Sequence, residues 1–312
     1  MRSMKILVTG AAGFIGSHLA ISLLNRGDNI LCVDNFNDYY DPNLKYLRKE
    51  RLDNVAIKNN RNKENYSFHK VDICNLSEIS KIVESYKPDV ICHLAAQAGV
   101  RYSLKFPQTY IDNNISATVN LLELSKEYDV KDFILASTSS VYGLSKNMPF
   151  REDAQIDTTI STYSATKRAC ELLCHTYRNI YGIRFRILRF FTVYGPWGRP
   201  DMALFLFTKG ILDEEAIDVF NNGKSIRDFT YIDDIVSGFI SAIGADYDFE
   251  IFNLGSGKTT QLMEFIKIIE NSLGLKAKIN FLPPQQGDID MTFADITKAK
   301  KMLGYHQIKI SS

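Results

Sequence analysis

The sequence predicts an α/β fold with a doubly wound parallel sheet. Short apolar runs typical of buried strands alternate with longer amphipathic segments typical of helices between residues 4 and 190, which is the order that βαβ units produce. The first apolar run ends in a glycine-rich turn, and the second ends in an aspartate. Because such a sheet binds ligands beyond the carboxyl ends of its strands, we expect the functional residues at those ends.

The elements follow one another in a regular order. Strands are expected at residues 4–9, 29–33, 66–71, 90–94, 133–136 and 183–190. Helices are expected from the glycine turn to residue 26 and at residues 77–86, 107–128 and 161–181. A further helix, short and charged, is expected after the loop that begins at residue 34. From residue 192 the pattern is irregular, with a return to the sheet between residues 231 and 254. The run 253–260 looks like a phosphate loop, but its required first glycine falls at Phe252, so we reject that interpretation.

Three glycines, Gly10, Gly13 and Gly16, form the turn after the first strand with the spacing G-x-x-G-x-x-G. Glycines let the backbone bend tightly and approach a pyrophosphate, whose charge the N-terminus of the following helix stabilises. Phe14 and Ile15 lie within this turn and are assigned to the same ligand. The turn therefore predicts a dinucleotide site, although its spacing differs from the ordinary G-x-G-x-x-G.

Asp34 stands at the end of the second strand, 18 residues after Gly16. A carboxylate there accepts hydrogen bonds from both hydroxyls of a ribose and repels a 2′-phosphate, which favours NAD over NADP. Asn35 follows it and is assigned to the same site. The alternative interpretation is an ordinary turn with a solvated aspartate.

The third and fourth strands also end in candidate cofactor residues. Asp72 and Ile73 follow the third strand, where they are placed to meet an adenine. Leu94, Ala95 and Ala96 follow the fourth strand, and the small side chains there allow a cofactor to lie close to the backbone. These positions extend the predicted site along the edge of the sheet.

Hydroxyl side chains gather just past the fifth strand, in residues 137–143. Thr138, Ser139 and Ser140 lie there, in the crevice where a substrate should meet the nicotinamide ring. The alternative interpretation is a Ser/Thr-rich turn with no ligand.

Tyr163 and Lys167 are four residues apart in a segment free of Pro and Gly from residue 161 to residue 181. In a helix they project from one face, where the ammonium, with a positively charged nicotinamide, stabilises a phenolate and brings the pKa of Tyr163 towards neutrality. The same spacing occurs at Tyr66, in a predicted strand, and at Tyr142, in a loop. We therefore predict that Tyr163 is the base, with an ordinary surface pair as the alternative.

The composition narrows the class of partner. The 37 Lys and Arg nearly balance the 36 Asp and Glu, so nothing indicates binding to nucleic acid or to an anionic membrane. Five scattered cysteines indicate reduced thiols, and the five histidines show no metal-ligand spacing. With no signal peptide and no apolar run of about 18 residues, we expect a soluble, cytoplasmic protein without a metal site.

These motifs together resemble those of the extended short-chain dehydrogenases/reductases, and among them the nucleotide-sugar epimerases. The match runs nearly end to end, and Thr138 precedes Tyr163 by 25 residues, as in the epimerases. The resemblance implies a Rossmann-like NAD domain at residues 1–191, with about 228–257 added to its sheet, and a smaller nucleotide-sugar-binding region at 192–227 and 258–312. It also implies tightly bound NAD, a homodimer formed through paired helices, and a further terminal helix beyond Ser312.

The reaction implied by the resemblance is C4 epimerisation without net redox. Tyr163, as phenolate, takes the proton from the sugar O4 while NAD takes the hydride from C4. Thr138 hydrogen-bonds the same oxygen, and Lys167 holds the nicotinamide ribose and keeps Tyr163 acidic. The 4-keto sugar then turns over and receives the hydride on its other face.

Two runs, residues 34–42 and 190–202, resemble those of UDP-glucuronate 4-epimerases in particular, which implies conversion of UDP-glucuronate to UDP-galacturonate. A 4-keto-glucuronate loses CO2 when its C5–C6 bond aligns with the carbonyl, so we expect Ser139, Ser140 and Thr192 to hold the carboxylate out of alignment. Related decarboxylases carry Glu at position 140, and dehydratases carry Asp-Glu at 139 and 140. Many related epimerases carry Asn at position 192.

Arg199 and Arg227 are candidates for the pyrophosphate and uridine end, because a guanidinium donates two parallel hydrogen bonds. Arg101 and Asp288 are further candidates for contact with the substrate, and a surface role is the alternative for each. Three alternatives for the whole chain stay open: a 4-epimerase of UDP-glucose or UDP-N-acetylglucosamine, a UDP-glucuronate decarboxylase, and a non-catalytic protein on the same fold.

Overall fold

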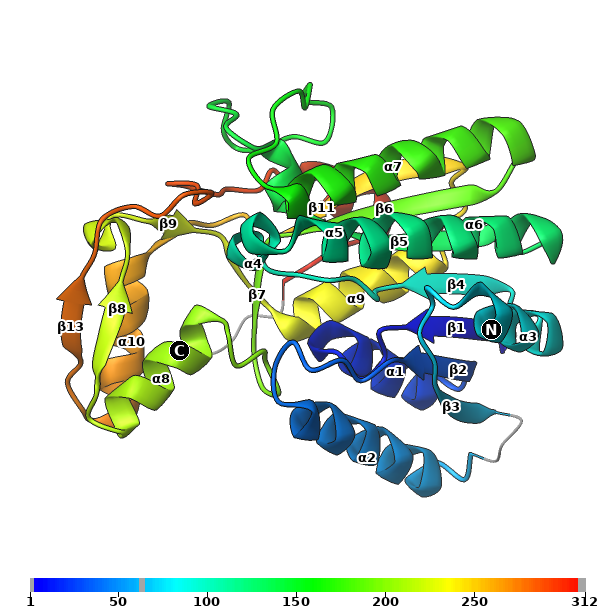
Figure 1. Cartoon of the computed structure of the whole chain (residues 1–312), viewed down its shortest axis with the longest axis horizontal. Helices are drawn as coiled ribbons and strands as arrows, with labels where there is room; N and C mark the ends of the chain where they lie inside the picture. The colour runs from blue at the N-terminus through cyan, green and yellow to red at the C-terminus, as the bar shows by residue number, and fades with distance from the viewer. Residues whose placement is uncertain (1–2, 62–64, 308–312) are drawn as a thin grey trace.

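A computed structural model describes residues 3–61 and 65–307, which form a larger and a smaller lobe (Figure 1). The larger lobe is built on a parallel sheet in the strand order β11-β6-β5-β4-β1-β2-β3. These strands are β1 Lys5–Thr9, β2 Asn29–Asp34, β3 Tyr66–Lys70, β4 Val90–His93, β5 Asp132–Thr138, β6 Arg184–Phe190 and β11 Phe249–Leu254. The predicted Rossmann-like, doubly wound fold is confirmed, and the strand order reverses direction between β1 and β4.

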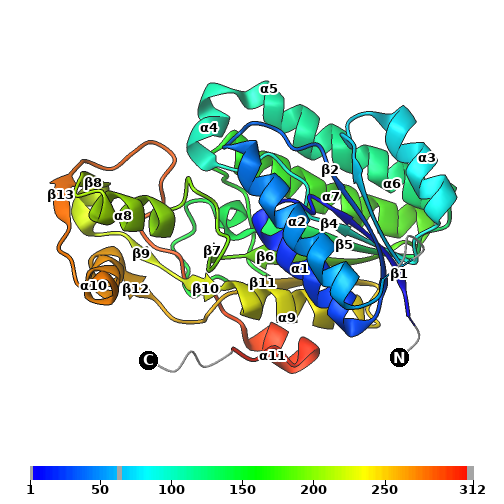
Figure 2. The same cartoon turned by 90° about the horizontal axis from the view of Figure 1, so that it is seen from below.

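Helices cover both faces of this sheet, as Figure 2 shows. One face carries α1 Phe14–Arg26, α2 Pro42–Lys58, α9 Ile232–Ile243 and α11 Thr297–Leu303. The other carries α3 Leu76–Tyr86, α6 Ala117–Glu127 and α7 Thr162–Tyr181. Each face has its own apolar core, so the strands are buried on both sides. None of the described helices is both long and apolar enough to cross a bilayer.

The smaller lobe has a separate core between two helices and a short sheet. Its helices are α8 Ala203–Leu212 and α10 Leu262–Leu273, and β8 Ala216–Val219 pairs in parallel with β13 Lys278–Phe281. Two further strand pairs connect the lobes, β7 Thr192–Tyr194 with β10 Phe229–Tyr231 and β9 Ile226–Arg227 with β12 Thr260–Gln261. The domain boundaries stay a prediction, but α11 packs on α9 and β11 of the larger lobe.

The segment predicted as one helix at 107–128 is more complex. It consists of α5 Pro107–Tyr110, a π-helical turn at Ile111–Ser116 and α6, and α4 Val100–Lys105 precedes it. The wider turn lets Asn114 bind a neighbouring segment, because its amide accepts from Gln97 N at 2.8 Å and donates to Gln97 O at 3.1 Å. The helix after residue 34 was also expected to be short, whereas α2 has 17 residues.

The segment 253–260 wraps around a buried aspartate. Asp228 Oδ1 accepts from Ser256 N at 2.6 Å, and Oδ2 accepts from Gly257 N at 3.0 Å and Ala294 N at 3.2 Å. The backbone N–H groups that a phosphate would need therefore bind an internal carboxylate. This confirms that the segment is not a phosphate loop.

A buried ion pair joins α7 to the sheet. Glu171 accepts from Arg189 Nε at 3.0 Å and Nη2 at 2.8 Å, and from Ser137 Oγ at 2.6 Å, and the two charged side chains are each 1% exposed. Burial by itself would raise the pKa of Glu171, but Arg189 and the other hydrogen-bond donors hold it below its usual range. The carboxylate is therefore charged at neutral pH and fixes α7 on β6.

Glu171→Ala is expected to lower the free energy of unfolding by about 3–5 kcal/mol, because it leaves a buried guanidinium without its partner. Since the pKa of Glu171 is lowered on folding, the stabilisation is present at neutral pH and is lost as the pH falls through that lowered pKa. Chemical denaturation at pH 7 measures the loss. Lys209→Ala, which breaks an exposed pair with Asp213, should change stability little. Equal effects of the two substitutions would contradict the assignment.

Candidate active site

One pocket opens along the carboxyl ends of the sheet strands, beside the junction of the two lobes. All of the residues predicted to bind the cofactor line it. They are Gly10, Gly13, Phe14, Ile15, Gly16, Asp34, Asn35, Asp72, Ile73, Leu94, Ala95, Ala96, Tyr163 and Lys167. Strands that are distant in the sequence thus place these side chains on one wall, as a doubly wound sheet should.

The glycine turn forms a cradle that a side chain would fill. Gly10 has φ +68°, and a Cβ atom there would lie 2.7 Å from Ala95 N. A Cβ atom on Gly16 would overlap Gly10 O. Helix α1 begins at this turn with no side-chain cap and no acidic residue in its first turn, so its first amides and the positive end of its dipole are available to an anion. The turn therefore fits a diphosphate.

Asp34 closes the far end of the cradle. Its Oδ2 accepts from Ala12 N at 3.0 Å and its Oδ1 from Phe36 N at 2.8 Å, which orients the carboxylate at the pocket wall. Burial raises the pKa of Asp34, and the ammonium of Lys45 opposes that shift. A fixed acidic group at this place fits the ribose hydroxyls of NAD and not a 2′-phosphate.

The start of α7 positions Tyr163 in the pocket. Ser161 caps the helix by accepting from Ser164 N at 3.1 Å, and Ser164 Oγ accepts from Ser161 N at 3.2 Å. This reciprocal cap fixes the first turn. Tyr163 lines the pocket, and the Thr138 hydroxyl at the end of β5 lies near enough to lower the pKa of its phenol. Lys167, one turn later, donates to Ala136 O at 2.8 Å.

The acidity of the tyrosine differs from the sequence prediction. Desolvation raises the pKa of Tyr163, while the hydrogen bond from Thr138 and the charge of Arg199 lower it. Burial also lowers the pKa of Lys167. In the protein by itself the pKa of Tyr163 is therefore shifted upwards, opposite to the shift expected with a bound nicotinamide, because the loss of water around the phenol outweighs the groups that stabilise a phenolate. The shift in the presence of the nicotinamide stays a prediction.

The other two Tyr-x-x-x-Lys spacings lie outside the pocket. Tyr66 is in β3, and its hydroxyl donates to Asp53 Oδ1 at 2.7 Å. Tyr142 is buried, and its hydroxyl donates to Asn253 Oδ1 at 2.6 Å. Of the three tyrosines only Tyr163 lines the pocket, and its role as the base stays a prediction. The described residues hold no group of three His, Cys, Asp or Glu side chains arranged to bind a metal.

The predicted substrate residues fall into separate groups. Ser139 and Ser140 lie in the 3-10 turn Ser139–Tyr142 after β5, where Thr138 Oγ1 donates to Ser140 Oγ at 3.2 Å. Thr192 begins β7, and its N–H donates to Asp228 O at 3.1 Å. Thr138 and the two serines therefore stand together, with Thr192 on the strand that leads into the smaller lobe.

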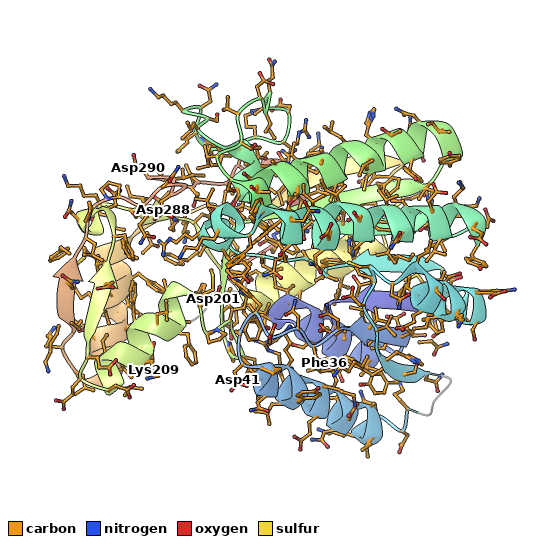
Figure 3. The ribbon with its side chains drawn as sticks, in the orientation of Figure 1. Phe36, Asp41, Asp201, Lys209, Asp288 and Asp290 are labelled. Atoms are coloured by element: carbon orange, nitrogen blue, oxygen red, sulfur yellow. The ribbon has the colours of Figure 1, made fainter. Side chains whose placement is uncertain are left out.

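One predicted arginine lines the pocket, and the other two lie where α4 meets the smaller lobe. Arg199 lines the pocket and donates from Nε to Asp201 Oδ1 at 2.9 Å. Arg101 pairs with Asp288 at 3.0 Å, and Arg227 donates to the backbone oxygen of Asp290 at 3.0 Å. Figure 3 shows Asp288 and Asp290 near one end of the smaller lobe and Asp201 at the junction. Arg101, Arg227 and Asp288 thus form a second group, outside the pocket lining.

Sequence reasoning missed several pocket residues. They are Val33, Asn37, Tyr39, Tyr40, Lys45, Val71, Gln97, Ala98, Asn113, Ala136, Ser137 and Phe190. Four come from residues 37–45, a stretch whose chemistry the sequence left open. A signal was present in α2, whose buried positions are Lys45, Arg48, Leu52 and Ala56, because charged residues at core spacing on a helix indicate an inward function.

The parallel sheet, the glycine cradle, the fixed aspartate and the Tyr163–Thr138 contact define a dinucleotide-dependent enzyme of the short-chain dehydrogenase/reductase type. The chain belongs to the NAD dependent epimerase/dehydratase family, whose model matches residues 6–255.

Three relatives illustrate the similarity. A UDP-glucuronate 4-epimerase of Thermodesulfobacterium geofontis is 46% identical over 300 residues, covering 96% of this chain and 90% of the relative. The structure of UDP-glucuronic acid 4-epimerase from Bacillus cereus, in complex with UDP-glucuronic acid and NAD, is 39% identical with a TM-score of 0.89, covering 98% and 94% of the two chains. UDP-glucose 4-epimerase from Thermotoga maritima, with UDP-glucose, is 32% identical with a TM-score of 0.86, covering 99% and 94%.

Thr138→Val is expected to raise the pKa of Tyr163, because it removes the nearby hydroxyl that lowers that pKa by stabilising the phenolate. Tyrosinate absorbance, taken as the difference between each protein and its Tyr163→Phe counterpart, isolates this residue from the other tyrosines. Thr138→Ser retains the hydroxyl and should give a pKa close to that of the unaltered protein. A Thr138→Val protein with an unchanged or lower pKa at Tyr163 would refute the contact.

Proposed function

We propose that this protein interconverts UDP-glucuronate and UDP-galacturonate by epimerisation at C4, with NAD bound tightly in the pocket. The observation that carries the proposal is the position of Tyr163 in a pocket that the glycine cradle and Asp34 also line, with the Thr138 hydroxyl near enough to lower its pKa. The similarity to UDP-glucuronate 4-epimerases over nearly the whole chain supports the choice of sugar.

The protein residues handle the proton and the orientation of the substrate. Tyr163 Oη removes the proton from the sugar O4, and Thr138 Oγ1 hydrogen-bonds the same oxygen and relays the proton. NAD supplies the acceptor and donor of the C4 hydride. The ammonium of Lys167, held by Ala136 O, binds the nicotinamide ribose and adds positive charge beside the phenol. Because desolvation raises the pKa of Tyr163, the Lys167 ammonium and the positive charge of the nicotinamide are both needed to bring that pKa back towards neutrality.

Hydroxyl groups in the turn after β5 and at the start of β7 suit a substrate that carries a carboxylate. Ser139 and Ser140 follow Thr138 directly, and Thr192 lies at the start of β7. Their hydroxyls donate to the substrate carboxylate and hold it away from the alignment that releases CO2. No carboxylate side chain stands at position 139 or 140, where the decarboxylases and dehydratases that the chain resembles place one.

The cationic group between α4 and the smaller lobe binds the nucleotide end. Arg227 and Arg101 carry fixed positive charge beside Asp288, and Arg199 reaches the pocket from the junction. Guanidinium groups suit the diphosphate, and Asp288 suits the uridine ribose. Residues 192–227 and the part of 258–312 that precedes α11 are accordingly proposed as the nucleotide-sugar-binding region, because α11 packs on the larger lobe and residues 308–312 lie outside the described residues.

We also propose a homodimer in the cytoplasm. Helices α6 and α7 pack side by side, and α7 carries the exposed apolar residues Leu172, Ile180 and Tyr181, which suit burial against a second copy. All five cysteines are free, and all but Cys74 are buried, as expected in a reducing compartment.

Incubation of the purified protein with UDP-glucuronate, followed by NMR, tests the proposed reaction. UDP-galacturonate should form with no CO2 release, and the two sugars should reach equilibrium. Release of CO2 with a UDP-pentose product would identify a decarboxylase, and turnover restricted to UDP-glucose or UDP-N-acetylglucosamine would identify a neutral-sugar epimerase. Either outcome would overturn the proposal.

Tyr163→Phe is the matched control, because it removes one hydroxyl and leaves the ring in place. This variant should retain bound NAD, measured after denaturation, and lose turnover by at least about 100-fold, the usual contribution of a general base. Near-normal turnover would remove Tyr163 from the mechanism.

A further inference from the structure

Arg48 is a charged side chain in the core to which the proposed reaction gives no role. It lies on α2, and its side chain is 0% exposed. Burial lowers the pKa of its guanidinium, yet a guanidinium remains protonated in proteins. Burying such a charge is costly unless its donors are satisfied, so its hydrogen bonds require an explanation.

All five N–H groups of Arg48 donate hydrogen bonds. Nε donates to Trp197 O at 3.1 Å, Nη1 to Ala12 O at 3.2 Å and Tyr40 Oη at 2.6 Å, and Nη2 to Trp197 O at 2.6 Å and Gly198 O at 3.1 Å. These acceptors are uncharged oxygens on three separate segments. An ammonium has its three donors at one point and cannot reach the same set.

Each of the three segments contributes to the pocket. Ala12 lies in the glycine turn, and Tyr40 lines the pocket directly. Trp197 and Gly198 form the turn immediately before Arg199, which also lines the pocket. Arg48 therefore joins the cofactor side of the pocket to the segment that carries a substrate arginine.

The turn before Arg199 needs an external support. Trp197 has φ +60°, a backbone region that is strained for a bulky residue and persists only where the surroundings enforce it. The carbonyl of this strained residue accepts two of the five Arg48 bonds. Arg51, one turn further along α2, lies over the Trp197 ring with its guanidinium carbon 5.7 Å from the centroid. Helix α2 thus holds both the backbone and the side chain of this residue.

We propose that Arg48 is a positioning residue that fixes the Trp197–Gly198 turn against the glycine turn, so that Arg199 meets the nucleotide sugar in a preset orientation. An arginine held in advance loses less conformational freedom when it binds. The inference rests on the proposed function only in taking a UDP-sugar as the ligand of Arg199.

A double-mutant cycle tests whether Arg48 acts through Arg199. UDP-glucuronate affinity is measured by ligand-observed NMR on NAD-loaded protein in a Tyr163→Phe background, so that binding is recorded without turnover. Arg48→Lys is expected to weaken binding about tenfold, the effect of a lost charged hydrogen bond. In an Arg199→Lys background, the side chain at position 199 can no longer donate two parallel hydrogen bonds. There Arg48→Lys should weaken binding by less than about twofold.

The control and the opposing outcomes separate positioning from general destabilisation. Lys58→Ala removes an exposed cation of the same helix, α2, and should leave the affinity unchanged. Equal losses from Arg48→Lys in both backgrounds, or no loss in either, would overturn the proposal. If Arg48→Lys does not fold, Tyr40→Phe removes one acceptor and leaves Arg48 in place. Tyr40→Phe should weaken binding about twofold to fivefold when Arg199 is present and have no effect in the Arg199→Lys background. The same effect in both backgrounds would also overturn the proposal.

Failure of this inference is distinguishable from failure of the proposed function. The cycle reports binding alone, whereas the proposed function fails through absent or different turnover in protein that retains Tyr163. If the cycle gives the expected coupling between Arg48 and Arg199 but the protein does not epimerise UDP-glucuronate, only the proposed reaction is contradicted.

Discussion

The structure of the site depends on the close contact between the ends of β1 and β4. Thr9 Oγ1 accepts from Leu94 N at 3.2 Å and from Ala95 N at 3.1 Å, which draws the backbone after β4 against Gly10. A Cβ atom on Gly10 would collide with that backbone. This contact fixes the position of the glycine turn at the end of the sheet, and it thereby also fixes the position of the N-terminus of α1. The cofactor cradle is therefore a consequence of how two parallel strands end.

Buried polar networks extend this arrangement to the rest of the pocket. Glu171 and Arg189 fix α7 on the sheet, so the helix that carries Tyr163 is held at a set distance from Thr138. Arg48 performs a similar task between the glycine turn and the segment before Arg199. In each case a satisfied charge replaces apolar packing, because directional bonds specify geometry more closely than apolar contacts do. The chemistry thus depends on residues that never meet the substrate.

The sequence predicted those parts of the fold that local patterns encode. Gly10 and Asp34 could be assigned because a turn and a strand end have local signatures, and the helix that became α7 followed from a segment free of Pro and Gly at residues 161–181. The π-helical turn around Asn114 was missed because its partner Gln97 is a tertiary contact. Arg48 was missed for the same reason, since its acceptor Trp197 is 149 residues away. The raised pKa of Tyr163 also depends on burial, which spacing alone does not reveal.

The most direct test of the central contact compares two glycines with the same backbone strain. Gly10 and Gly182 have φ +68° and +69°, but a Cβ atom on Gly182 would meet nothing within 4 Å. Both alanine substitutions carry the cost of a left-handed backbone, so Gly182→Ala controls for that cost, and Gly10→Ala adds the collision with the backbone of Leu94 and Ala95 at the pocket wall. NAD affinity, measured by calorimetry, should fall by at least about 100-fold in Gly10→Ala, the size of effect expected when a cofactor cradle is displaced by about 1 Å, and stay unchanged in Gly182→Ala. A folded Gly10→Ala protein that binds NAD normally would contradict the account.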